Sequence, residues 1–215
     1  LASKIRINNR KRTHYFERQM GKSLTHIPEK FHANHPVFLQ KIGKFFLSIT
    51  GWKFKGDIPK DDRILLVAGP HTSNWDFFLA LAFIFGLNLN VYWVGKHTLF
   101  KNGFSKLMRK LGGIPVDRAS PEQLMNDVSA IIKKHQGVII AISPEGTRKK
   151  VKRLKSGFLR IAKTTNSQIL LAGIDFESKL IHLGKLFQPT GDTENDLSNV
   201  HNYFRQFKGK RPEFS

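Results

Sequence analysis

Short strand-like runs alternate with segments of helical periodicity along most of this 215-residue chain, and this alternation constrains its fold more than any other feature. The strand-like runs, most of them aliphatic, lie at residues 52–55, 64–68, 91–94, 114–116, 138–142, 169–174 and 180–183. Apolar residues recur at helical spacing in the segments 75–85, 100–111, 121–134, 154–163 and 197–207. Strands alternating with helices predict one α/β domain over residues 51–215, with a largely parallel sheet flanked by helices.

The first 50 residues differ in character from the rest of the chain. Residues 1–35 are polar and basic without a strong period, and we expect a loose or helical arm. Residues 35–50 place apolar side chains at helical spacing with two lysines between them, which predicts an amphipathic helix too short and too charged to cross a bilayer. Such a helix would pack on the core or lie on a membrane surface, and the pattern leaves both open. Its apolar residues are Val37, Phe38, Ile42, Phe45, Phe46 and Ile49.

The net charge restricts the partners that we expect. The chain holds 36 Lys and Arg against 16 Asp and Glu, a formal charge of +20, concentrated in residues 1–35 and 147–163. A surplus of this size favours a polyanionic partner, which could be nucleic acid, an anionic membrane surface, or an acidic carrier or phosphorylated substrate. A nucleic-acid-binding module should interleave aromatic residues with its basic residues or carry a recognisable reading motif. We find neither and expect no nucleic acid.

The most informative polar residues follow the strand predicted at 64–68. Gly-Pro closes that strand, and Ser73 or Asn74 can cap the helix that follows. His71 would then lie at the mouth of the strand, with Asp76 about one turn into the helix. A histidine can act as a general base because its reference pKa of ~6.5 is close to working pH, and a carboxylate can hold it in one tautomer. A structural His–Asp pair is the alternative.

Three other strand ends carry unusual residues. Asp-Arg at 117–118 follows one strand, Ser-Pro-Glu-Gly-Thr-Arg at 143–148 follows another, and Ala-Gly at 172–173 lies in a third. Singly, each could be a surface loop with an ion pair of little energetic value. In a parallel sheet, however, active sites collect at the carboxyl ends of the strands, and arginine suits bidentate binding of phosphate.

These blocks resemble those of the glycerolipid acyltransferase family, whose members acylate lysophosphatidic acid and related acceptors. His-Thr-Ser-Asn-Trp-Asp at 71–76 is similar to the first block, His-x4-Asp. Gly-Gly-Ile-Pro-Val-Asp-Arg at 112–118 resembles the second block, and Pro-Glu-Gly-Thr-Arg at 144–148 the third. Ile-Leu-Leu-Ala-Gly at 169–173 stands where the fourth belongs, without the usual proline. The resemblance covers roughly residues 50–205.

The resemblance implies an acyl transfer from a thioester, acyl-CoA or acyl-ACP, to the hydroxyl of a lysophosphatidic acid-like acceptor in phospholipid biosynthesis. It implies that His71 is the base and Asp76 its partner. The residues implied to bind the acceptor's glycerol phosphate are Arg118, Glu145, Gly146, Thr147 and Arg148. No cofactor beyond the acyl donor is expected.

The chemistry is consistent with this reading of the residues. A thioester is already activated, so a hydroxyl needs only a base, alignment and charge stabilisation. An acyl-enzyme is not expected, because the chain has no cysteine and no Gly-x-Ser-x-Gly motif. His-x4-Asp is not a zinc-binding pattern, and we expect no metal.

The partners and location follow from the expected acceptor. A lysolipid resides in a bilayer, so we expect a peripheral or monotopic protein on the cytoplasmic face of a membrane, held to its anionic surface by the first 50 residues. The alternatives are another acceptor, namely glycerol 3-phosphate, a lyso-aminolipid or another lysophospholipid. A non-catalytic basic protein that binds lipid or nucleic acid is a further alternative.

Overall fold

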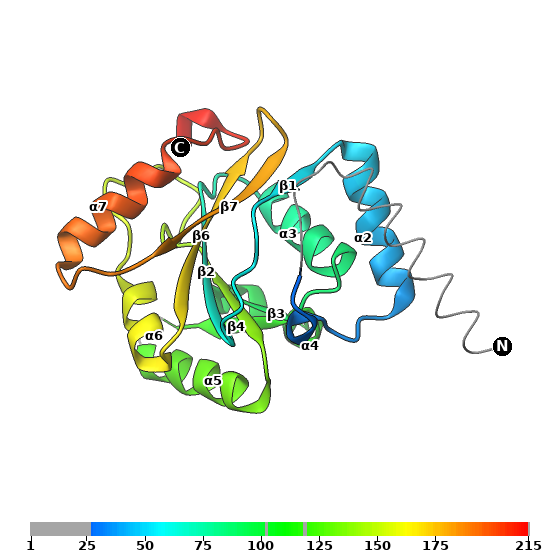
Figure 1. Ribbon diagram of the computed structural model, residues 1–215, viewed down its shortest axis with the longest axis horizontal. Helices are drawn as coiled ribbons and strands as arrows, with labels where there is room; N and C mark the ends of the chain where they lie inside the picture. The colour runs from blue at the N-terminus through cyan, green and yellow to red at the C-terminus, as the bar shows by residue number, and fades with distance from the viewer. Residues whose placement is uncertain (1–26, 102, 118–119, 215) are drawn as a thin grey trace.

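The computed structural model describes residues 27–101, 103–117 and 120–214, and the strands among them form one twisted sheet (Figure 1). The order across the sheet is β1-β7-β6-β2-β5-β3-β4. Their bounds are β1 Lys53–Lys55, β2 Arg63–Gly69, β3 Val91–Lys96, β4 Gly113–Val116, β5 Val138–Ile142, β6 Gln168–Asp175 and β7 Leu180–Phe187.

Most neighbouring strands run parallel, as the alternation of strands and helices predicts. The strands from β6 through β2, β5 and β3 to β4 all run in the same direction. β7 pairs antiparallel with β6 because only a short turn joins the two, and β1 pairs parallel with β7 at the edge. The opposite edge is β4, whose Pro115 lacks the N–H that a central strand would need for pairing on both sides.

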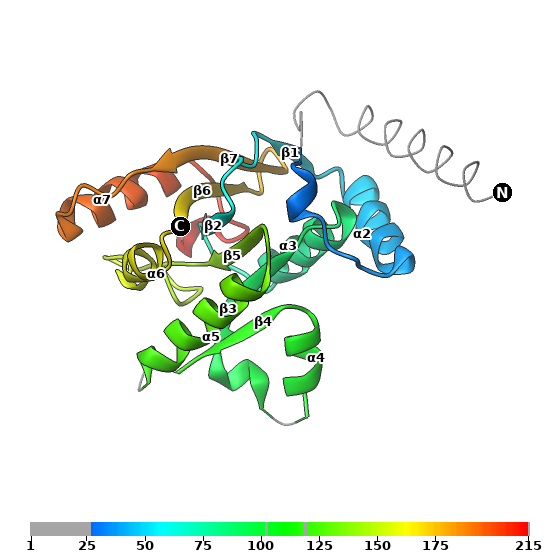
Figure 2. The same ribbon diagram turned by 60° about the horizontal axis from the view of Figure 1, so that its bottom comes forward.

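Helices cover both faces of the sheet (Figures 1 and 2). α2 and α3 pack on one face, and α5, α6 and α7 pack on the other. Successive residues of β2 show why both faces need cover, since Ile64 belongs to one apolar cluster and Leu65 to the other. The helices are α2 Val37–Thr50, α3 Trp75–Gly86, α4 Ser105–Lys110, α5 Pro121–Lys134, α6 Gly157–Thr165 and α7 Thr193–Phe204, and the short 3₁₀ turns are η1 Glu29–Phe31, η2 His97–Phe100 and η3 Pro212–Phe214.

Three predicted helices have different bounds. The helix expected at 100–111 is divided into η2 and α4, because Gly103 adopts a left-handed φ of 81° between them. The helix expected from 154 begins at Gly157, since the backbone N–H of Lys155 donates to Pro144 O at 2.8 Å and holds this part of the chain in a loop. The last helix begins four residues earlier than expected, where the Asp192 side chain accepts hydrogen bonds from the first turn.

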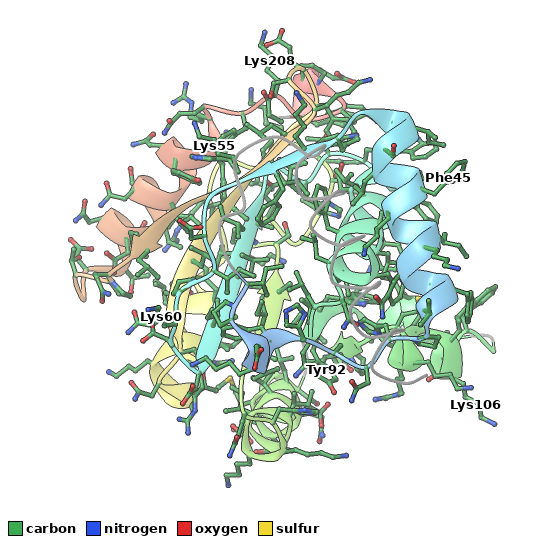
Figure 3. All side chains as sticks on the ribbon, turned by 45° about the vertical axis from the view of Figure 1, so that its right-hand side comes forward. Phe45, Lys55, Lys60, Tyr92, Lys106 and Lys208 are labelled. Carbon is green, nitrogen blue, oxygen red and sulfur yellow. The ribbon has the colours of Figure 1, made fainter. Side chains whose placement is uncertain are left out.

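α2 packs on the core with one face, as one of the two expectations had it, and leaves its other face exposed. It packs closely on α3, because Gly43 lies so near the α3 backbone that a Cβ there would be 2.6 Å from Ala82 O. Its opposite side exposes a stripe of large apolar side chains, of which Phe45 is 66% exposed (Figure 3). Phe46, expected to share that stripe, is half-buried and packs against the core. The other members of the stripe are Val37, Phe38, Ile42 and Ile49. Within the described ranges, no helix is long and apolar enough to cross a bilayer.

Candidate active site

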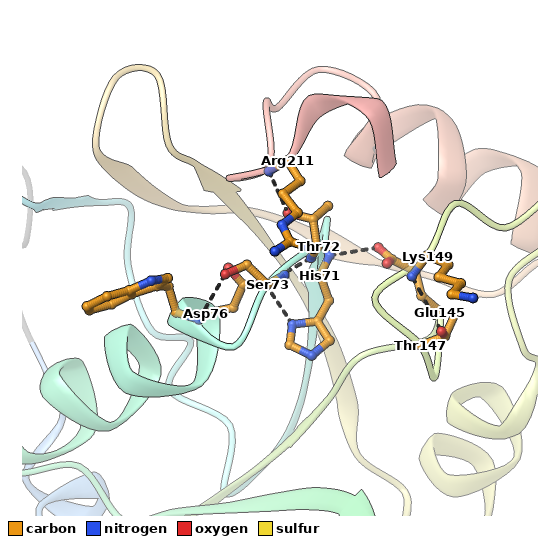
Figure 4. A network of polar contacts seen from close by, with 9 residues as sticks. His71, Thr72, Ser73, Asp76, Glu145, Thr147, Lys149 and Arg211 are labelled. Atoms are coloured by element: carbon orange, nitrogen blue, oxygen red, sulfur yellow. Dashed lines mark hydrogen bonds and ion pairs between the residues drawn. The ribbon is translucent and has the colours of Figure 1, made fainter.

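The loop at residues 70–74, here called the His71 loop, joins the carboxyl end of β2 to α3. A cis peptide bond joins Gly69 and Pro70 at its start. Asp76 is only the second residue of α3, nearer the helix start than the sequence predicted. The Asn74 side chain does not cap the helix, and it is Ser73 Oγ that accepts the backbone N–H of Trp75 at 3.0 Å. The loop therefore turns sharply and brings His71 back beside the start of α3 (Figure 4).

His71 and Asp76 form a direct contact. Nδ1 of the imidazole lies 2.8 Å from Asp76 Oδ2. An ionised carboxylate can only accept hydrogen bonds, so in the neutral ring Nδ1 carries the proton and Nε2 keeps its lone pair. The His71 side chain is 29% exposed, and Nε2 can accept a proton from a substrate hydroxyl. The pair expected from the sequence is thus in place.

The Asp76 carboxylate is held by more than the histidine. Its side chain is 2% exposed, and Oδ2 also accepts the backbone N–H groups of Thr72 at 2.9 Å and Ser73 at 2.8 Å. The start of α3 adds the positive end of a helix dipole. These groups stabilise a buried negative charge, which in turn stabilises the imidazolium that forms when His71 takes a proton.

Glu145 comes from the loop after β5, the strand next to β2 in the sheet. It is 7% exposed, and its Oε1 accepts the backbone N–H of His71 at 3.0 Å (Figure 4). Burial raises the pKa of Glu145 from its ordinary 4.5 to about 7, although the His71 N–H and imidazole act to lower it. The carboxyl group thus ties two strand ends together at the base of the site.

The rest of the predicted phosphate-binding block continues from Glu145. Gly146 adopts a φ of 62°, which favours glycine, and its N–H donates to Ser143 O at 3.3 Å. Thr147 is half-buried, and its Oγ1 accepts the backbone N–H of Lys149 at 3.4 Å. Arg148 is exposed. The remaining member of the predicted set, Arg118, lies outside the described residues, just after edge strand β4.

Two residues that the sequence did not single out lie beside the His71 loop. The backbone N–H of Arg211 donates to Thr72 Oγ1 at 3.2 Å, and Lys210 Nζ lies 4.5 Å from the centre of the Trp75 ring. Both follow α7 in the chain, and Figure 4 shows Arg211 beside Thr72. The only sequence feature related to their position is Gly173 in the fourth block. A Cβ there would be 2.2 Å from Phe207, so this glycine leaves room for the segment that carries Lys210 and Arg211.

In this arrangement a carboxylate holds a histidine at the carboxyl end of the central strand β2, where it can act as a base. Among the described residues, no three His, Asp or Glu side chains gather as a set of metal ligands. A base of this kind is suited to removing the proton of a hydroxyl as it attacks an activated acyl group.

Comparisons with known proteins bear on the family and the fold of the chain. The model of a family described as Acyltransferase matches residues 52–174. The crystal structure of the 1-acyl-sn-glycerophosphate (LPA) acyltransferase PlsC from Thermotoga maritima is similar in fold, with a TM-score of 0.53 and 21% sequence identity over 79% of this chain and 76% of that one. No curated protein sequence matches the chain significantly.

Proposed function

The chain belongs to the acyltransferase family, and from that premise we propose that it moves a fatty acyl chain from acyl-CoA or acyl-ACP to the hydroxyl of a lysophosphatidic acid-like acceptor. The observation that carries the proposal is the 2.8 Å contact between His71 Nδ1 and Asp76 Oδ2, inside the matched region. It leaves Nε2 free to act on a hydroxyl.

The acceptor hydroxyl attacks the thioester directly, without an acyl-enzyme intermediate. His71 Nε2 takes the proton of the acceptor hydroxyl while its oxygen attacks the thioester carbonyl carbon. The C–S bond breaks, an ester bond replaces it, and the imidazolium returns its proton to the leaving sulfur. Asp76 keeps the ring in its orientation and stabilises the transient positive charge. No residue of the chain is acylated, and no electrons are transferred to or from a cofactor.

We assign binding of the acceptor's phosphate to Arg148, Arg118 and the loop that carries Glu145, Gly146 and Thr147. Support comes from the position of this loop, because Glu145 bonds the backbone of His71 directly. Arg148 is exposed in the same loop, where a guanidinium can bind phosphate through two hydrogen bonds.

The acceptor's acyl tail places the reaction at a membrane, and we propose peripheral attachment at the cytoplasmic face through α2. Its outward stripe of exposed apolar side chains supports this, as does the charge of +20 on the chain. Each Lys or Arg near an anionic surface contributes about 1 kcal/mol, and this part is screened by salt. Apolar insertion adds a part that salt does not weaken.

The test is a transfer assay on the purified protein with radiolabelled palmitoyl-CoA, followed by identification of the products by mass. Lysophosphatidic acid, glycerol 3-phosphate and lysophosphatidylcholine serve as parallel acceptors, so the product also decides between acceptor classes. His71→Ala should lower turnover by about 10²–10⁴-fold. His32→Ala, which replaces an exposed histidine, is the matched control and should keep full turnover. Full activity in His71→Ala would refute the mechanism.

A further inference from the structure

Residues 205–214, here called the strap, follow α7, include η3 and pass beside the His71 loop. It lies near the carboxyl ends of β6 and β2 (Figures 1 and 4). The N–H of Phe176 donates to Lys208 O at 2.8 Å, and the N–H of Lys208 donates to Asp175 Oδ1 at 3.0 Å. Further along, the N–H of Arg211 donates to Thr72 Oγ1. The strap is thus tied at one end to β6 and at the other to the His71 loop.

Two glycines at strand ends make room for this part of the chain. A Cβ on Gly173 of β6 would be 2.2 Å from the Phe207 ring, and a Cβ on Gly69 of β2 would be 2.9 Å from the Phe204 ring. Neither distance is compatible with a side chain at the glycine. The ends of both strands are therefore shaped for α7 and the strap, which lie beyond the region matched by the family model.

The strap places two cationic residues next to the His71 loop. Lys210 Nζ lies over the Trp75 ring. The backbone of Arg211 is hydrogen-bonded to Thr72, and its guanidinium lies 5.8 Å from the centre of the Phe214 ring. Thr72 and Trp75 both lie between His71 and Asp76 in the sequence. Both cationic residues are exposed, and among the described residues neither forms an ion pair, whereas Lys208 on the same strap pairs with Glu177 at 2.6 Å.

We propose that Lys210 and Arg211 bind a phosphate group of a substrate whose reacting atoms lie at His71; this rests on the proposed function. A guanidinium and an ammonium held a residue apart suit a phosphate, the first through paired N–H groups and the second as a compact charge. The strap's backbone bonds fix the positions of both residues, and contacts with the Trp75 and Phe214 rings hold their charged groups before the substrate arrives, which lowers the entropic cost of binding.

Two sources of phosphate fit this chemistry. Both the glycerol phosphate of the acceptor and the nucleotide part of a coenzyme A donor carry it. Lys210 also lies 5.9 Å from the ring of Phe176, just past β6, whereas Arg148 follows β5. Because β6 and β5 flank β2 on opposite sides, the chain offers cations on both sides of His71. The two substrates can therefore each have a phosphate site, and kinetics can assign them.

The test measures binding of coenzyme A and of glycerol 3-phosphate to the whole chain by calorimetry, together with the KM of each substrate. Lys210→Ala and Arg211→Ala should each weaken binding of one probe, and raise the KM of the matching substrate, by about tenfold or more at little change in kcat. Lys210→Arg keeps the positive charge and should retain most of the binding that Lys210→Ala loses. Lys208→Ala removes a cation from the same strap and serves as the matched control, with unchanged binding.

The two probes separate the outcomes. A loss for coenzyme A alone assigns the site to the donor, and a loss for glycerol 3-phosphate alone assigns it to the acceptor. Unchanged binding and KM values in the double variant, with its thermal midpoint kept, would overturn the proposal, as would the absence of binding of either probe to the wild type. If no acceptor is acylated and the variants still lose probe binding, the proposed function fails while the phosphate site stands.

Discussion

Replacing Glu145 with glutamine should change how the stability of the protein depends on pH. The carboxyl group is 7% exposed, and burial raises its pKa to about 7 from an ordinary 4.5. A raised pKa means that the folded state binds this proton more tightly than the unfolded chain does. The contribution of this group to the free energy of unfolding therefore has its full value below pH 4.5 and is lost as pH rises through 7.

The size of the effect follows from the pKa shift. At 1.36 kcal/mol per pKa unit, ionising the buried carboxyl costs about 3 kcal/mol of stability. Glutamine has nearly the same shape, and its Oε1 can still accept the His71 N–H that Glu145 accepts at 3.0 Å. It has no proton to lose in this range. The variant should therefore keep at pH 8 the stability that the wild type loses between pH 5 and pH 8.

Urea denaturation followed by tryptophan fluorescence at pH 5 and pH 8 measures this directly. The free energy of unfolding should fall between pH 5 and pH 8 by about 3 kcal/mol more in the wild type than in Glu145→Gln. The titration of other groups cancels in that comparison. Glu213→Gln in η3 is the matched control, because an exposed carboxylate keeps its water and carries no cost of burial. The same pH dependence in Glu145→Gln and the wild type would show that ionised Glu145 is hydrated, and the reasoning would be wrong.

Three further outcomes are expected. Asp76→Asn should lower turnover by at least about 10²-fold in steady-state assays with little change in KM, because the amide no longer selects the Nδ1-protonated tautomer of His71; unchanged turnover would contradict this role. Arg148→Ala should raise the acceptor's KM about ten- to a hundred-fold and leave the donor's unchanged, and an acceptor KM equal to that of the wild type would make this arginine structural. Phe45→Ser should weaken co-sedimentation with anionic vesicles, most visibly at high salt where the charge-driven part is screened, whereas unchanged binding of the variant at high salt would refute attachment through α2.

Local pattern was sufficient to predict most elements and one half of the site. The aliphatic runs and helical periods identified the α/β class because strand and helix formation depend largely on nearby residues. His71 and Asp76 are five residues apart, so a strand end followed by a helix start was enough to bring them together. The predicted helix boundaries were wrong where a single residue sets the boundary, as at Gly103 and Asp192.

Only the tertiary structure decided what surrounds that pair. Glu145 reaches the His71 N–H across 74 residues, because β5 lies beside β2 in the sheet. Arg211 reaches Thr72 across 139 residues, because Gly173 leaves room for Phe207 and the strap can lie close to β6. Contacts this far apart in the chain depend on strand order and on the packing of both apolar clusters. Neither of these is a property of any local stretch of sequence.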